Sequence, residues 1–164
     1  MCKFDITQTS NIVLQLDTDL RKDFVECTYF LCSDLAMVSP FIDHLTRMIN
    51  GLRGMDEAEV DIEVALREAL LNAVIHGNRE DPHKHVYVTI FCGADEEVSM
   101  AIRDEGAGFD IGDVPDPTAP EHRMSTHGRG IYLMRALMDE VSFEEGGTVV
   151  CMRKGTTSRS YRSQ

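Results

Sequence analysis

Glu68-Ala-Leu-Leu-Asn-Ala-Val-Ile-His-Gly77 is the stretch of this 164-residue sequence that most strongly indicates its fold. It places a carboxylate, an amide and an imidazole at four-residue steps within an otherwise apolar helical pattern. At about 100° per residue, a helix turns these three side chains onto one polar stripe, which also includes Asp61 and Arg79. The stretch therefore predicts a helix with one face in the core and one face available for chemistry.

The carboxylate of Glu68 and the amide of Asn72 lie one helical turn apart in this prediction. Such a carboxylate takes a proton or orients a nucleophile, and an amide oxygen binds a hard cation such as Mg²⁺. A solvated polar face with hydrogen bonds between residues four apart explains the same pattern. The helix alone leaves both interpretations open, and the second half of the sequence favours the chemical one.

Two glycine-containing segments follow in that second half. Asp104-Glu-Gly-Ala-Gly108 comes directly after residues 98–103, whose alternation predicts a strand, so the acid lies at a strand end. Gly128-Arg-Gly-Ile-Tyr-Leu-Met134 begins with two glycines and continues as an apolar helical pattern. Glycines at a helix start let backbone N–H groups approach phosphate oxygens, and the helix dipole favours the anion. Each segment alone is common in loops, and together they indicate a nucleotide site.

The order and spacing of these three segments resemble the GHKL ATP-binding fold, which includes DNA gyrase, the MutL repair proteins and sensor histidine kinases. The resemblance is closer to the bacterial anti-sigma factor serine/threonine kinases and covers roughly residues 10–153. It implies an α+β fold, a two-layer α/β sandwich with a mixed, mostly antiparallel sheet and helices on one face. We expect a single domain over residues 1–154, with a lid at about 109–127, and a flexible tail at 155–164.

The resemblance also implies roles for individual residues. Glu68 would be the general base or would orient the attacking hydroxyl, Asn72 would bind Mg²⁺, and Asp104 would accept a hydrogen bond from the adenine amino group. Further contacts with ATP are expected at Gly106, Gly108, Gly128, Arg129, Gly130, Ile131 and Thr148. Of these, Thr148 would assist Asp104 around the adenine, whereas the Arg129 guanidinium either screens phosphate charge or is simply exposed at a helix start. His76 is expected beside the site and not as a metal ligand.

The function implied by the resemblance is phosphoryl transfer from Mg-ATP to a serine or threonine. The acceptor would be an anti-anti-sigma protein, a sigma factor would be sequestered, and the chain would form a homodimer. A non-catalytic, ATP-dependent regulatory binding module is the alternative. The sequence contains neither a Walker Gly-x-x-x-x-Gly-Lys motif nor a kinase His-Arg-Asp triplet, which disfavours those phosphate-binding families. A sensor histidine kinase would need phosphoacceptor helices before Glu68 and a gyrase-like or MutL-like ATPase would need a transducer domain after the sheet, so we expect neither class here.

Composition sets broader limits on function. A hydrophobic content of 43% over 164 residues fits one domain with a substantial core. A net charge of −12 argues against direct nucleic-acid binding, because a polyanion is repelled. The five cysteines lack metal-ligand spacing and are typical of a reducing cytosol. The sequence has no secretory signal and no apolar run of membrane-spanning length, so we expect a cytoplasmic protein that does not contact a membrane.

The remaining pattern predicts the other elements of the fold. A helix capped by Ser33 or Asp34 runs to about residue 52, and Pro40 marks either a kink or a later start near Ser39. The acidic residues 55–59 open the site helix. A third helix is expected at 130–139, and strands are expected at 11–16, 24–31, 84–92, 97–103, 141–143 and 148–152.

Overall fold

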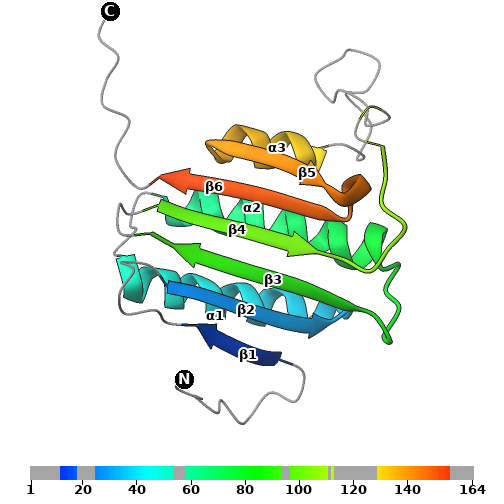
Figure 1. Ribbon diagram of the computed structural model, residues 1–164, viewed down its shortest axis with the longest axis horizontal. Helices are drawn as coiled ribbons and strands as arrows, with labels where there is room; N and C mark the ends of the chain where they lie inside the picture. Colours follow the sequence, from blue (N-terminus) through cyan, green and yellow to red (C-terminus); the bar gives the residue numbers. More distant parts are fainter. Residues whose placement is uncertain are drawn as a thin grey trace, which may run out of the picture.

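Strands and helices form two layers in the part of the chain that the computed structural model describes, residues 12–17, 25–53, 58–93, 97–110, 112 and 129–155. Within these residues, six strands make one sheet, and the helices cover one of its faces (Figure 1). The elements follow in the order β1 (Ile12–Asp17), β2 (Val25–Cys32), α1 (Leu35–Arg53), α2 (Glu59–Leu71), η1 (Asn72–Gly77), β3 (His85–Cys92), β4 (Glu97–Arg103), α3 (Arg129–Leu137), β5 (Glu140–Glu144), η4 (Glu145–Gly147) and β6 (Val149–Gly155). The predicted α+β sandwich is confirmed.

The strand order is β1-β2-β3-β4-β6-β5, and each pair of neighbours in the described sheet is antiparallel. The expectation of a mixed sheet is therefore wrong for these strands. Two helices connect β2 to β3, so the chain returns to the end of the sheet that it left. Helix α3 lies between β4 and β5 in the described part of the chain. These two strands run in the same direction, but β6 lies between them and pairs antiparallel with both.

Helix α1 begins at Leu35 and is capped by Asp34. The backbone N–H of Ala36 donates to Asp34 Oδ1 at 2.9 Å, as expected for an N-cap carboxylate. The helix continues through Pro40, so the predicted alternative of a start near Ser39 is wrong. Since proline has no N–H, this position removes one hydrogen bond from the second turn of α1.

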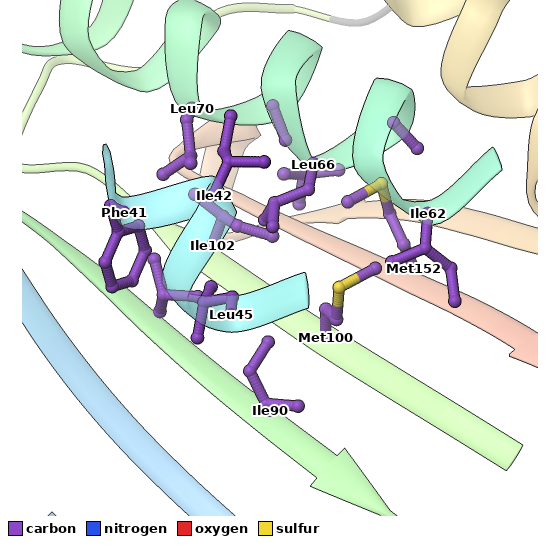
Figure 2. Close-up of a cluster of buried hydrophobic side chains, with 14 of the residues drawn as sticks. Phe41, Ile42, Leu45, Ile62, Leu66, Leu70, Ile90, Met100, Ile102 and Met152 are labelled. Atoms are coloured by element: carbon purple, nitrogen blue, oxygen red, sulfur yellow. The ribbon is translucent and has the colours of Figure 1, made fainter. Parts of the chain in front are cut away.

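The core lies between the sheet and the helical layer. Along β3, Val86, Val88 and Ile90 have at most 1% of their surface exposed, whereas Tyr87 and Phe91 are exposed on the other face. Figure 2 shows side chains of α1 and α2 packed together over the strands. The labelled residues are Phe41, Ile42 and Leu45 from α1, Ile62, Leu66 and Leu70 from α2, and Ile90, Met100, Ile102 and Met152 from the sheet. This packing fixes the position of α2, which carries the polar motif.

The site helix changes its geometry within that motif. Helix α2 ends at Leu71, and residues Asn72–Gly77 form a π-helical segment, η1. The wider turn is closed by the N–H of Asn78, which donates to the carbonyl of Ala73 at 2.8 Å. Arg79 lies beyond the helix end with a φ of 59°, so its predicted place on the polar stripe is wrong. A regular 3.6-residue wheel does not describe residues after a π-turn.

The other predicted elements are confirmed with shifts of a few residues at their ends. The strands near 11–16 and 24–31, the hairpin of 84–92 with 97–103, and the helix near 130–139 all occur. Strand β6 continues through Gly155. Most of the predicted lid, namely residues 111 and 113–127, and residues 156–164 of the tail lie outside the described residues. In the described part, no helix combines the length and the apolar character needed to cross a membrane.

Candidate functional site

A cavity of about 530 Å³ lies between the site helix, α3 and the inner face of the sheet. Its volume is in the range of pockets that bind small molecules and cofactors. Predicted site residues from both halves of the chain meet in its wall: Glu68, Asn72, Asp104, Gly108, Gly130, Ile131 and Thr148. The structure therefore brings together most of the residues selected from the sequence, although up to 80 residues separate them along the chain.

Glu68 and Asn72 face the first turn of α3. A Cβ atom added to Gly130 would lie 2.7 Å from Glu68 Oε2 and 3.5 Å from Asn72 Nδ2. The helix start thus rests directly on the two polar side chains, and a larger residue at position 130 would displace them. Carboxylate and amide oxygens form a donor set of the kind that Mg²⁺ binds. This cluster is the polar end of the cavity.

Asp104 follows β4 at the other end of η1. Its backbone N–H donates to the carbonyl of Thr148 at 3.0 Å, and its Oδ1 accepts a hydrogen bond from the N–H of Gly106 at 2.7 Å. A Cβ atom on Gly77 would overlap the Asp104 carboxyl group, so η1 ends in close contact with this acid. Burial raises the pKa of Asp104, and the Gly106 N–H and the charge of Lys84 oppose that shift. The carboxylate is partly desolvated and is suited to accept a hydrogen bond from a ligand.

A tight backbone crossing closes the cavity beside Asp104. The N–H of Phe109 donates to the carbonyl of Gly146 at 2.9 Å, and a Cβ atom on Gly108 would overlap that carbonyl. Gly108 and Gly147 have φ angles of 74° and 88°, a region that favours glycine. The hydroxyl of Thr148 donates to the carbonyl of Glu145 at 3.0 Å. The glycines thus allow the loop after β4 to pack directly on η4.

Among the described residues, two predicted contacts, Gly106 and Arg129, do not line this cavity. Gly106 packs on the carbonyl of Gly77 and lines a separate hollow on the other side of the sheet, together with Tyr87 and Arg103. Arg129 begins α3 with an exposed side chain. Gly128 lies outside the described residues. His76, in contrast, lines the cavity as a neighbour of the site.

The apolar walls of the cavity were not predicted from the sequence. They include Ile75, Ile102, Phe109, Met134, Phe143 and Val150. The rings of Phe109 and Phe143 meet edge to face, with centroids 5.6 Å apart. Ile102 and Met134 have the burial of ordinary core residues, at most 1% exposed, so hydrophobic periodicity does not distinguish a cavity wall from the core.

The arrangement suits a ligand that has a flat apolar part and a polar, anionic part. Its apolar walls leave room for a ring system, and Asp104, Glu68, Asn72 and the start of α3 supply the polar groups of its lining. Helices on one face of an antiparallel sheet with such a cavity define a nucleotide-binding ATPase domain.

Comparison with known proteins agrees with this class. Residues 31–154 match the model of the histidine kinase-like ATPase domain. The chain therefore belongs to the histidine kinase-like ATPase family, whose members bind ATP.

Several relatives are named as kinases or anti-sigma factors. Serine-protein kinase RsbW of Bacillus licheniformis is 33% identical over 119 residues, which cover 63% of this chain and 74% of the relative. The anti-sigma F factor of Heyndrickxia coagulans is 33% identical over 124 residues, covering 71% of this chain and 78% of the relative. The anti-sigma F factor of Bacillus subtilis is 33% identical over 131 residues, which cover 76% of this chain and 78% of the relative. Within its family, the chain thus falls among the ATP-dependent serine/threonine kinases of the anti-sigma factor type.

Proposed function

We propose that this protein transfers the γ-phosphoryl group of ATP to a serine or threonine hydroxyl of a partner protein. One observation carries the proposal: Glu68 and Asn72 meet Gly130 at one end of a cavity whose other end holds Asp104. A nucleotide held by its base at Asp104 and by its phosphates at the start of α3 would place the reacting bond beside a carboxylate.

The Asp104 end of the cavity would favour adenine as the base of the nucleotide. Asp104 would accept a hydrogen bond from the adenine amino group, whereas guanine presents a carbonyl oxygen at that position. A carboxylate facing that carbonyl would remain unpaired and repelled, so guanine would bind more weakly. Thr148 and Gly108 line the same region and would contact the edge of the ring.

At the phosphate end, Asn72 would bind Mg²⁺ through its amide oxygen. The bound ion would neutralise phosphate charge in the transition state. Backbone N–H groups of Gly128, Arg129, Gly130 and Ile131 would approach phosphate oxygens, since the N-terminus of α3 favours an anion. Glu68 would orient the attacking hydroxyl and take its proton, the usual role of a positioned carboxylate in this chemistry.

The partners are proposed from the names of the relatives, which include anti-sigma F factors. We infer that this chain also holds a sigma factor, that its phosphoacceptor is an anti-anti-sigma protein, and that it acts as a homodimer. Residues 109–127 would form a lid that closes over the nucleotide. Gly106 would act through Asp104, whose carboxylate accepts a hydrogen bond from the Gly106 N–H. Residues 1–154 would be the functional domain.

Phosphotransfer is tested with purified protein, Mg-ATP labelled at the γ-phosphate, and the anti-anti-sigma proteins of the same genome as acceptors. Glu68→Gln should reduce transfer at least about 100-fold while ATP binding is retained, as expected for loss of a general base. Glu63→Gln is the matched control, because Glu63 lies on the same helix and pairs with Arg67 on the surface at 3.1 Å. Transfer by Glu68→Gln at the wild-type rate would remove the base assignment. Mg-ATP binding without transfer to any acceptor would favour the regulatory binding module.

A further inference from the structure

Asn78 is a buried polar residue that the sequence motif did not include. It follows η1 directly, and only 1% of its surface is exposed. Its Nδ2 donates to Ser33 Oγ at 2.6 Å and to the carbonyl of His85 at 2.8 Å. Its Oδ1 accepts a hydrogen bond from the backbone N–H of Glu105 at 2.7 Å. One carboxamide therefore links the end of the site helix to the residue after β2, to β3 and to the loop after β4.

The bond to Glu105 places this network next to the proposed adenine contact. Glu105 lies between Asp104, whose carboxylate lines the cavity, and Gly106, whose N–H donates to that carboxylate. On one side the loop is fastened by the Asp104 N–H, which donates to Thr148 at 3.0 Å. On the other side it is fastened by Asn78. Two backbone bonds at successive residues thus fix the base of the Asp104 side chain.

The geometry of η1 adds a steric reason for this anchor. Gly77, the residue before Asn78, leaves room for the Asp104 carboxyl group only because it has no Cβ. Residues 77 and 78 therefore set the position of the acid together, one by contact and one by hydrogen bonding. Serine or alanine at position 78 would not reach Glu105, and no other residue of this length offers both a double donor and an acceptor.

We propose that Asn78 is a positioning residue for adenine recognition, which acts by fixing the Asp104 loop before the nucleotide arrives. This inference rests on the proposed contact between Asp104 and adenine. The hydrogen bonds from Asn78 Nδ2 to Ser33 and His85 hold the carboxamide in the core. The hydrogen bond that Asn78 Oδ1 accepts from the Glu105 N–H then fixes the loop relative to that carboxamide. Preorganisation of this kind lowers the cost of ordering a site on binding.

Nucleotide binding by the wild type, Asn78→Ala and Ser33→Ala distinguishes a role in positioning Asp104 from a role in the stability of the fold. For Asn78→Ala, the Kd of ATP should rise about tenfold, the size expected for losing one buried hydrogen-bonded anchor. The Kd of GTP should not change, and kcat at saturating ATP should stay within about twofold, since Glu68 and Asn72 are untouched. Ser33→Ala is the control, because it removes a partner of Nδ2 but leaves the bond to Glu105. It should lower the melting temperature and keep the preference for ATP over GTP. An unchanged preference in Asn78→Ala would overturn the proposal.

Amide hydrogen exchange provides a second readout that does not depend on nucleotide. In the nucleotide-free wild type and in Ser33→Ala, the Glu105 amide should be protected from hydrogen exchange. In Asn78→Ala it should exchange at the rate of an amide in an open loop. Rapid exchange of this amide in the wild type would overturn the proposal even if Asn78→Ala does not fold. If the wild type shows no preference for ATP over GTP, both the role of Asp104 and the proposal fail, and exchange still reports whether the anchor exists.

Discussion

Asp104 illustrates at the residue scale how a site is made at the expense of stability. Its carboxyl group is held between Gly77 and Gly106, and burial raises its pKa above the ordinary value of 3.8. The native state therefore binds this proton more tightly than the unfolded chain does. In the nucleotide-free protein the Gly106 N–H and the charge of Lys84 offset part of the lost hydration of the ionised form. A ligand donor such as the adenine amino group would offset more of it.

We predict that Asp104→Asn stabilises the nucleotide-free protein at pH 7 while it weakens ATP binding. For a carboxyl group with a raised native pKa, the free energy of unfolding decreases as pH rises from about 3.9, the unfolded value, through the native pKa. Asparagine keeps the acceptor for the Gly106 N–H and lacks this titration. The difference in unfolding free energy should thus be largest above the native pKa and should vanish near pH 4. Urea unfolding at several pH values measures it, and a variant less stable than the wild type at pH 7 would contradict this account.

Gly130 is a second residue whose identity follows from a single contact. A methyl group there would lie 2.7 Å from Glu68 Oε2, so Gly130→Ala must move either the carboxylate or the start of α3. A shift of about 1 Å at a reacting group costs on the order of 100-fold in rate. We therefore expect Gly130→Ala to lose at least tenfold in phosphotransfer, with little change in the Kd of ATP if only Glu68 moves. Steady-state kinetics with an acceptor protein checks this, and full activity would show that the contact relaxes freely.

At the element scale, Gly51 in α1 is the matched counterpart of Gly130. A Cβ atom at position 51 would meet nothing within 4 Å, and the residue is exposed. Gly51→Ala should therefore raise the free energy of unfolding by about 0.5–1 kcal/mol, because alanine loses less backbone entropy in a helix. Denaturant unfolding measures the gain, and phosphotransfer should be unchanged. A loss of stability would mean that α1 does not tolerate a side chain at this position.

The site helix shows how far helical periodicity in the sequence predicts the structure of one element. Periodicity located α2 and placed Glu68, Asn72 and His76 together, because Glu68 lies in α2 and the other two lie within the first five residues of the π-helical segment that continues it. The same arithmetic failed for Arg79, since local pattern does not reveal a change from 3.6 residues per turn. Asp61 points instead to a different partner, Lys154 Nζ, at 2.8 Å. An ion pair between residues so distant in the chain is invisible to a helical wheel.

At the scale of the whole molecule, the sandwich was predicted because the order and spacing of three separated motifs resemble the GHKL ATP-binding fold. Strand alternation identified both strands of the β3–β4 hairpin, and glycine positions identified the turns around it. The apolar cavity wall and the Asn78 network were missed for the same physical reason. Phe143 and Asn78 acquire their roles only from residues that tertiary packing brings next to them. The six-stranded order likewise depends on β6 lying between β4 and β5.

The cavity joins elements that the chain brings together only on folding, so ligand binding should stabilise the whole molecule. Its walls include residues of α2, η1, β4, α3, β5 and β6, and the unfolded chain has no such site. Binding to the native state alone adds about 2.7 kcal/mol to the free energy of unfolding when ATP is 100 times its Kd. For a domain of this size, that corresponds to a rise in Tm of roughly 5–10 °C.

This stabilisation should be specific for adenine and should depend on Asp104. We expect Mg-ATP to raise Tm, and each further tenfold in free ATP to add about 1.4 kcal/mol once the site is saturated. GTP at the same concentration should give a much smaller rise, and Asp104→Asn should respond weakly to ATP although its nucleotide-free form is the more stable at pH 7. Differential scanning calorimetry across an ATP series measures all of these quantities. Equal rises with ATP and GTP would mean that the phosphate end alone holds the nucleotide and that Asp104 does not read the base.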